Sequence, residues 1–416
     1  MQSIPASELA QEILQACLRN GTWPARALDA LIERALDEED PLLATAATQA
    51  LFRYVVEPLA DLFEPALCDV YARLFSYVIA RALPGYEAEE LFVRYQRIRQ
   101  VRKFLGGQVQ NVFVLSRVTL GADVAVTSCV LAAAKQRFPG ARIFFVGPAK
   151  NAELFAADPS IRPVPLVYGR STVLRERLLA ASELEAIVEE PGAIVLDPDS
   201  RLTQLGLLPI CDDARYYFFE SRAFGGDTDA GLTDLTSQWL SEVFDMERTE
   251  PYLALVLQPK IAEITVSFGV GENADKRIGG DFEYEVLRAL LRYGVSVLID
   301  RGAGGEEAER ITALAQRLGS PGNLLLHDGS YASFASHIVQ SRLYVGYDSA
   351  GQHVANAARV PLVSIFTGYV SERMLSRWRP RGPQARVIAI GESDRCSALE
   401  RTLEAIDRTW AEAAPR

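Results

Sequence analysis

The chain has 416 residues, of which 49% are hydrophobic and 23% are charged, and its formal net charge at pH 7 is −11. This composition is typical of a globular protein with two or three domains and excludes a disordered or low-complexity chain. The acidic balance argues against a non-specific nucleic-acid binder, because such a protein needs a basic surface to release counterions.

The first part of the chain, residues 1–105, is predicted to be an all-helical domain. Ser7 is expected to cap the first helix, because apolar side chains follow it at a spacing close to 3.6 residues. Strand-like alternation is absent from this part of the sequence, and the Gly106-Gly107 pair is expected to end it. Further helices are predicted at 25–36, 41–54, 56–82 and 87–105.

Residues 106–250 are predicted to form a Rossmann-like α/β domain. A short, β-branched apolar strand at 111–118 leads through a helical stretch at 123–137 to a second strand at 142–146. Two strands that flank a helix in this way indicate a parallel sheet covered by helices. Further strands are predicted near 163–167, 193–196 and 216–220, and further helices at 172–189 and 233–245, the latter within a connector at 225–250.

Residues 251–416 are predicted to repeat this alternation in a second Rossmann-like domain. The fold class is therefore α/β, with two such domains preceded by a helical one. Tandem domains of this kind leave a cleft between the carboxyl ends of their strands, where ligands bind. Strands are predicted at 264–268, 295–299, 324–326, 343–346 and 362–366, and helices at 281–293, 305–318, 331–340, 350–358 and 396–413.

The turn after the first strand, Leu120-Gly121-Ala122-Asp123, is the first candidate site. Small residues let the chain turn from strand to helix and leave the helix start open to a ligand. Asp123 is expected at the mouth of the cleft, where an aspartate serves either as a general base or as the N-cap of the helix. The residue type by itself favours the cap.

The loop at 269–280, between a predicted strand and a predicted helix, is the second candidate site. Its adjacent cations, Lys276 and Arg277, suit a diphosphate. The whole chain has only five lysines, so a lysine at this place is notable. The alternative is a pair of solvated loop charges.

The segment from Tyr347 to His353, again between a strand and a helix, is the third candidate site. Asp348 or Ser349 is expected to cap that helix. The backbone N–H groups at Ser349, Ala350 and Gly351 would then form an anion pocket at the positive end of the helix dipole, with His353 facing the cleft. The alternative is an ordinary capped helix with a hydrogen-bonded histidine.

The remaining polar groups are interpreted as structural. Asp212-Asp213 and Asp197-Pro198-Asp199 are predicted to form turns. The five cysteines include no CxxC pair and the three histidines form no HExxH arrangement, so we predict buried free thiols and no metal site. The chain shows neither a secretory signal nor an apolar run of about 20 residues, so a cytoplasmic protein is expected, with peripheral contact to the inner membrane left open.

Two of these motifs resemble those of glycosyltransferase family 9, the ADP-heptose:lipopolysaccharide heptosyltransferases. Leu120–Val124 and Phe138–Ala141 are similar to its first-strand motif, with Ala122 and Cys129 at the usual glycine and proline. The second match is more specific. It is to the family's signature Asp-Ser-Gly-x-x-His-x-x-Ala-Ala and the strand that follows, and Ala350 stands at the position of the usual glycine. It comprises Asp348-Ser349-Ala350-Gly351-Gln352-His353-Val354-Ala355-Asn356-Ala357 and 360–366.

The resemblance covers about 106–395 and implies a GT-B fold and transfer of a heptose-like sugar, with inversion, from a nucleotide diphosphate donor, ADP-linked by analogy. Asp123 is then the catalytic base, and the turn Gly304-Gly305-Glu306 holds the place of a nucleotide contact. The implied donor-binding residues are Lys276, Arg277, Glu306, Asp348, Ser349, Ala350, Gly351 and His353, with Gly121 and Ala122 on the acceptor side.

No cofactor and no metal are implied, because cations and a helix dipole would serve the leaving group. The acceptor stays open among glycan, lipid-linked and protein hydroxyls, as does contact of residues 1–105 with a membrane or a protein. Two alternatives also stay open: a nucleotide-sugar epimerase on the same fold, and a sugar-nucleotide-binding or scaffold protein without catalysis.

Overall fold

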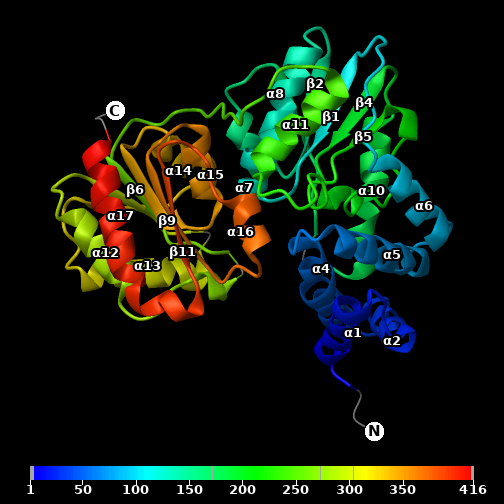
Figure 1. The fold of residues 1–416 in the computed structure, drawn as a ribbon, viewed down its shortest axis with the longest axis horizontal. Helices are drawn as coiled ribbons and strands as arrows, with labels where there is room; N and C mark the ends of the chain where they lie inside the picture. The colour runs from blue at the N-terminus through cyan, green and yellow to red at the C-terminus, as the bar shows by residue number, and fades with distance from the viewer. Residues whose placement is uncertain (1–3, 170–171, 272, 303, 414–416) are drawn as a thin grey trace. The chain divides into compact units, whose positions relative to one another are not determined.

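The computed structural model describes residues 4–169, 172–271, 273–302 and 304–413 (Figure 1). The chain folds into two compact units. The first combines the chain up to Val118 with 130–149 and 160–249, and the second combines 119–129 and 150–159 with the chain from Glu250 onward. The predicted boundary at 250 coincides with the last of these transitions, while the division into three domains stays a prediction.

The N-terminal part of the first unit is helical, as predicted. Pro5, and not Ser7, stands at the N-cap of the first helix, so the predicted cap is wrong. The last predicted helix ends at Ile98 rather than at 105. The backbone beyond it bonds to a distant part of the chain instead of continuing the helix: the Phe104 amide donates to the Val243 carbonyl at 2.7 Å. The elements are α1 (Ala6–Asn20), α2 (Ala25–Ala35), α3 (Pro41–Leu51), the π-helical turn η1 (Phe52–Val56), α4 (Glu57–Asp61), α5 (Pro65–Ala82) and α6 (Ala88–Ile98).

The first sheet is parallel throughout and has the order β3-β2-β1-β4-β5. Because the chain runs outward from β1 and then returns to β4 on its other side, the strand order reverses between β1 and β4. Its strands are β1 (Asn111–Leu115), β2 (Arg142–Gly147), β3 (Ile161–Pro165), β4 (Ala193–Asp197) and β5 (Tyr216–Phe218), with helices α8 (Ser128–Arg137), α10 (Leu174–Val188) and α11 (Leu232–Phe244) and 3-10 turns η4 (Arg201–Thr203) and η5 (Asp213–Arg215).

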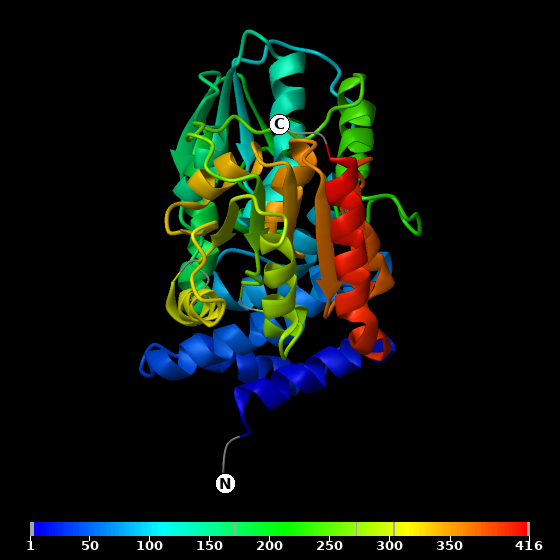
Figure 2. The same cartoon turned by 90° about the vertical axis from the view of Figure 1, so that its left-hand side faces the viewer.

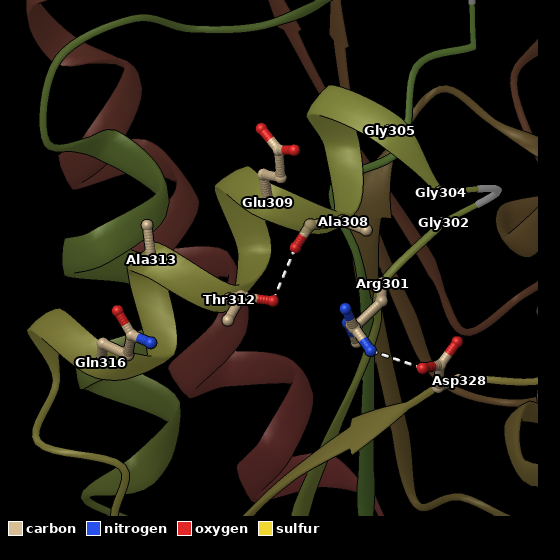
Figure 3. Close-up of a pocket in the computed structure, with 10 residues that line it drawn as sticks. All are labelled: Arg301, Gly302, Gly304, Gly305, Ala308, Glu309, Thr312, Ala313, Gln316 and Asp328. Carbon is tan, nitrogen blue, oxygen red and sulfur yellow. Dashed lines mark hydrogen bonds and ion pairs between the residues drawn. The ribbon is translucent and has the colours of Figure 1, made fainter.

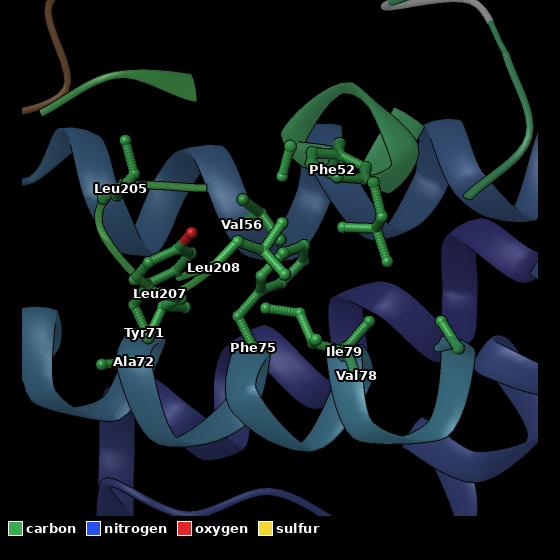
Figure 4. Packing of buried hydrophobic residues seen from close by; sticks show 14 of the residues in the cluster. Phe52, Val56, Tyr71, Ala72, Phe75, Val78, Ile79, Leu205, Leu207 and Leu208 are labelled. Atoms are coloured by element: carbon green, nitrogen blue, oxygen red, sulfur yellow. The ribbon is translucent and has the colours of Figure 1, made fainter. Parts of the chain in front are cut away.

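The helical segment and the first sheet share one hydrophobic core. Phe75 and Ile79 of α5 pack beside Phe52 of η1, and Leu205 and Leu208, which follow β4, complete the cluster (Figure 4). Helix α6 also packs against β5, and α10 against α3 and α5. The helices therefore bury their apolar faces against the sheet domain rather than only against one another.

Two short segments between these elements belong to the second unit. The first holds the three-residue helix α7 (Leu120–Ala122) and the π-helical turn η2 (Asp123–Thr127). The other holds most of α9 (Ala149–Ala152) and the 3-10 turn η3 (Glu153–Phe155). The candidate base Asp123 consequently lies in the same unit as the second and third candidate sites.

The second sheet is also parallel and has the order β11-β10-β9-β6-β7-β8, with its reversal between β6 and β9. Helix α16 and strand β11 were not predicted from the sequence. The strands are β6 (Ile264–Ser267), β7 (Val297–Asp300), β8 (Leu324–His327), β9 (Leu343–Tyr347), β10 (Leu362–Thr367) and β11 (Ala385–Ile390). The helices are η6 (Ala274–Lys276), α12 (Phe282–Leu291), α13 (Gly305–Arg317), α14 (Tyr331–Ile338), α15 (Ala350–Ala357), α16 (Glu372–Trp378), η7 (Glu392–Ser397) and α17 (Ala398–Glu412).

The side chains of β9 show which helices cover each face of this sheet. Leu343, Val345 and Tyr347 belong to a core formed with α12 and α17, and α17 runs along β11 and β10 (Figure 2). Tyr344, between them in sequence, contacts Gly351 of α15. Since successive side chains of a strand alternate in direction, α15 covers the face opposite to α17.

The predicted free thiols are present, but not all of them are buried. Cys17, Cys68 and Cys129 are buried, Cys211 is half-buried and Cys396 is exposed, and none forms a disulfide. Within the described ranges of the chain, no helix combines the length and the apolar character that crossing a membrane requires.

Candidate active site

An ion pair connects the second and third candidate sites. Lys276 ends η6 in the loop after β6, and Asp348 directly follows β9, so both lie at the carboxyl edge of the sheet where its strand order reverses. The Nζ atom of Lys276 lies 2.5 Å from Oδ2 of Asp348. Ligands of open α/β sheets bind at this kind of position. Glu272 of the same predicted loop lies outside the described residues.

Asp348 is held by α15 without capping it. Gln352 donates from Nε2 to Oδ1 of Asp348 at 2.5 Å, and its own Oε1 accepts from the Ser364 hydroxyl. Ser349 occupies the N-cap position, but its side chain makes no capping bond. The prediction that Asp348 or Ser349 caps the helix through its side chain is therefore wrong. Uncapped N–H groups at the start of a helix favour an anionic ligand.

Glycine is required at the next position of this turn. A Cβ atom added at Gly351 would lie 2.2 Å from the Tyr344 hydroxyl, which a residue with a side chain could not tolerate without a shift. Tyr344 is fully buried, and burial raises the pKa of its hydroxyl above the ordinary value. The start of α15 thus rests directly on an aromatic side chain of β9.

His353 is an uncharged side chain in this site. Only 9% of it is exposed, and its ring meets Trp378 of α16 edge-on at a centroid distance of 5.6 Å. Burial lowers the pKa of His353 to about 4, because the loss of solvation has a larger effect than the negative charge of Asp348, which raises the pKa. The imidazole is therefore neutral near pH 7 and cannot act there as a cation.

The first candidate site packs against the third. A Cβ atom at Gly121 would lie 3.0 Å from Cδ2 of His353 and 3.3 Å from Cα of Ala350, so α7 fits closely on the first turn of α15. Ala122 is buried beside this contact. Segments more than 200 residues apart in sequence are thereby brought together within the second unit.

Asp123 has a different environment from the one predicted. Its side chain is fully buried rather than exposed at a cleft mouth. It caps no helix: Oδ1 accepts from the Thr127 hydroxyl at 2.6 Å, and Oδ2 accepts from Nδ2 of Asn151 at 2.5 Å. The carboxylate is thus fixed by two side chains, one of them on a separate segment. The turn that begins with Asp123 is π-helical, a form that is frequent at functional sites.

Arg277 does not join Lys276. Its Nε lies 3.7 Å from Oε1 of Glu283 on α12, and Glu283 is also paired with Arg310 of α13. Burial raises the pKa of Glu283, while Arg310 and then Arg277 lower it. Of the two adjacent cations, Lys276 alone pairs with the turn before α15.

The two glutamates at the start of α13 have different positions. Glu306, the predicted nucleotide contact, is exposed. The carboxylate of Glu307 turns inward: a Cβ atom at Gly302 would lie 2.3 Å from its Oε2, and one at Gly269 would lie 2.5 Å from its Oε1. Glu307 therefore contacts the loops after both β6 and β7. This inward position was not predicted from the sequence.

A pocket of about 520 Å³ opens beside α13. Figure 3 shows Arg301 paired with Asp328 across it and Thr312 bonded to the carbonyl of Ala308. Gly302 and Gln316 also line it, but Lys276, Asp348 and Glu306 do not. The pocket adjoins the carboxyl ends of β7 and β8 without including the ion pair.

A comparison of the sequence with protein families finds a match to part of the second unit. Residues 273–404 match the profile of glycosyltransferase family 9 (heptosyltransferase). This chain carries a family 9 glycosyltransferase domain. The match includes the predicted donor residues from Lys276 to His353, whereas Asp123 lies outside it. The chain is therefore a glycosyltransferase that uses a nucleotide sugar.

Solved structures support the fold of this glycosyltransferase. E. coli heptosyltransferase WaaC with ADP matches at 16% identity with a TM-score of 0.54, over 73% of this chain and 100% of that one. The glycosyl transferase family 9 from Veillonella parvula matches at 14% and 0.55, over 74% and 99%, and E. coli ADP-heptose lps heptosyltransferase II at 17% and 0.52, over 73% and 99%. These likenesses confirm the predicted GT-B architecture. None of the curated proteins compared matches the chain significantly.

Within the described ranges, no group of three or more His, Cys, Asp or Glu side chains is arranged to hold a metal ion. The predicted roles of the site residues and the absence of a cofactor stay predictions at this point.

Proposed function

We propose that this glycosyltransferase moves a heptose-like sugar, with inversion, from an ADP-linked donor to an acceptor hydroxyl on a glycan, a lipid-linked glycan or a protein. The observation that carries the proposal is the close packing of Gly121 on Ala350 and His353. It brings the candidate base Asp123 into one unit with the uncapped helix α15 and the cation Lys276.

The start of α15 supports a diphosphate site. Its first N–H groups lack a side-chain cap, and Lys276 is positioned beside them by Asp348. Negative charge builds up on the diphosphate as the bond to the sugar breaks. Preorganised donors and a cation stabilise that charge where it develops, and no metal ion or other cofactor enters the proposal.

Asp123 is the proposed general base. The acceptor oxygen forms the new bond to the anomeric carbon, its proton passes to the Asp123 carboxylate, and the bond to the diphosphate oxygen breaks so that ADP leaves with the electron pair. Attack on the face opposite to the leaving group gives inversion. The role requires the acceptor to reach a carboxylate that is buried in this structure.

Titration calorimetry tests the donor site. ADP, GDP, UDP and CDP are titrated into the wild type and into the variants Lys276→Met and Lys260→Met. Lys260 is the matched control, because it pairs with Glu263 at 2.8 Å rather than with Asp348. We expect micromolar binding of ADP that Lys276→Met weakens by about tenfold or more, as for loss of one charge-assisted hydrogen bond, while Lys260→Met leaves it unchanged. Equal binding by both variants, or no binding of any diphosphate, would contradict the proposal.

A further inference from the structure

Asn151 lies next to the proposed base although it comes from a different part of the chain. It belongs to α9, which follows β2, and is 28 residues from Asp123 in sequence. Its side chain is fully buried, and its Nδ2 donates to Oδ2 of Asp123 at 2.5 Å. Thr127, in contrast, is one helical turn beyond Asp123 on the same element and bonds to the other oxygen.

The other end of the Asn151 amide lacks a hydrogen-bond partner among the residues that the structure describes. Its Oδ1 atom is buried and accepts no hydrogen bond from a donor in the described part of the chain. Leaving a buried polar atom unsatisfied costs free energy, so an apolar residue would serve better if the position only filled space. Among the described residues, the one hydrogen bond of this side chain is the bond to Asp123.

The backbone around Asn151 is held independently of that bond. The Ala254 amide donates to the Leu154 carbonyl at 2.9 Å, and the Ala157 amide donates to the Ala254 carbonyl at 2.7 Å. Leu154 and Phe155 are also buried, and Phe155 packs on the ring of Tyr252. The segment therefore does not need the Asn151 side chain as an anchor.

We infer that Asn151 is a positioning residue for the proposed base, which makes this inference dependent on the proposed function. An ionised carboxylate only accepts hydrogen bonds, so the amide nitrogen of Asn151 must face it. A donor at this place favours the charged form of Asp123 and fixes the orientation of its oxygens. Asn151 thus orients the carboxylate without touching the substrate itself.

Direct titration of the Asp123 carboxyl carbon tests the inference without any substrate. Carbon-13 NMR spectra of aspartate-labelled protein are recorded against pH, and Asp123→Asn assigns the signal. The variants are Asn151→Ala and the isosteric Asn151→Asp, with Asn323→Ala as control, because Asn323 bonds to the Val295 carbonyl at 3.1 Å and makes no contact with Asp123. We expect the titration midpoint to rise by about one pH unit in Asn151→Ala and by more in Asn151→Asp, where a second carboxylate adds repulsion. A midpoint unchanged in both variants would overturn the inference.

A measurement of turnover distinguishes a failure of this inference from a failure of the proposed function. ADP release from an ADP-linked sugar, with water as the acceptor, is followed against pH in the same variants. We expect Asn151→Ala to lower kcat by about tenfold or more, to leave the KM for the donor unchanged and to move the acid limb of the profile to higher pH. Wild-type turnover in Asp123→Asn would overturn the base role itself. A dead Asp123→Asn together with a wild-type pH profile in Asn151→Ala would overturn only the role of Asn151.

Discussion

At the scale of single residues, the site is a set of charged groups that other side chains hold in place. Lys276 pairs with Asp348, which Gln352 holds in turn, and Asp123 is held by Thr127 and Asn151. A diphosphate at the start of α15 would therefore meet a cation that is already fixed, which lowers the ordering cost of binding. His353 completes the contact between the two groups of residues but carries no charge near pH 7.

The neutral state of His353 predicts a pH dependence of stability. Its pKa is about 4 in the folded chain, against 6.5 without burial. Between these values the unfolded state binds more protons, so the stability that depends on a neutral His353 is lost as the pH falls from about 6.5 to about 4 and is constant above that range. The full effect is about 3 kcal/mol at 1.36 kcal/mol per pKa unit.

The prediction is checked with thermal unfolding of the wild type and His353→Gln between pH 4 and 8. A glutamine cannot take up the proton, so the wild type should lose more stability than the variant on acidification, and the difference between them should be flat above pH 7. Parallel curves over the whole range would show that His353 does not titrate as its burial implies.

At the scale of elements, the contact between β9 and α15 depends on a glycine. Ala350 stands where the family has glycine, and the next residue, Gly351, lies on the Tyr344 hydroxyl. The identity of residue 351 should then depend on the residue at 344.

Gly351→Ala tests this dependence. The added methyl group would overpack the turn, so we expect a loss of about 1–3 kcal/mol in unfolding free energy and weaker binding of ADP. In a Tyr344→Val background the same Gly351→Ala change should cost less in both, because the ring that the methyl group meets is absent. The comparison is made with Tyr344→Val alone, since loss of a fully buried tyrosine is itself destabilising. Gly322→Ala is the control, since nothing lies within 4 Å of a Cβ atom there. Equal behaviour of Gly351→Ala and the control would refute the steric account.

Elements with a strong local pattern were predictable from the sequence, and those set by tertiary contacts were not. The β-branched runs at 111–115 and 264–267 became β1 and β6 as predicted. Strand β11 was missed although its last four residues, Val387–Ile390, are apolar, and most of its side chains are only half-buried. The inward position of Glu307 could not be told from that of Glu306 by composition alone, although neighbouring helix positions face directions about 100° apart. The partner of Asp123 could not be found either, because Asn151 is 28 residues away and belongs to no motif.

At the scale of the whole molecule, the helical segment is part of the fold of the first unit. Beyond the shared apolar core, ion pairs join it to the end of the sheet domain: Arg99 lies 2.8 Å from Glu220, Arg94 lies 2.7 Å from Asp213, and Asp61 lies 3.5 Å from Arg222. Burial raises the pKa of Glu220 to about 7, and Arg99 opposes that rise. Removing the segment would take the counter-charge from Glu220 and Asp213, whereas Arg222 would keep its pair with Asp199.

Deletion of residues 1–105 should therefore prevent the first unit from folding, even though the family resemblance begins only near residue 106. The truncated chain would expose the side chains that α5 and η1 now cover, among them Leu205 and Leu208. Large exposed apolar patches of this kind promote aggregation. We expect the deleted form to be insoluble or to lack a cooperative melting transition, whereas Leu42→Ser in α3, where the side chain is 85% exposed, should leave melting nearly unchanged. A soluble, cooperatively melting chain without residues 1–105 would instead show that the helices are an appended module, and their ion pairs to Glu220 and Asp213 would then be surface contacts of little energetic weight.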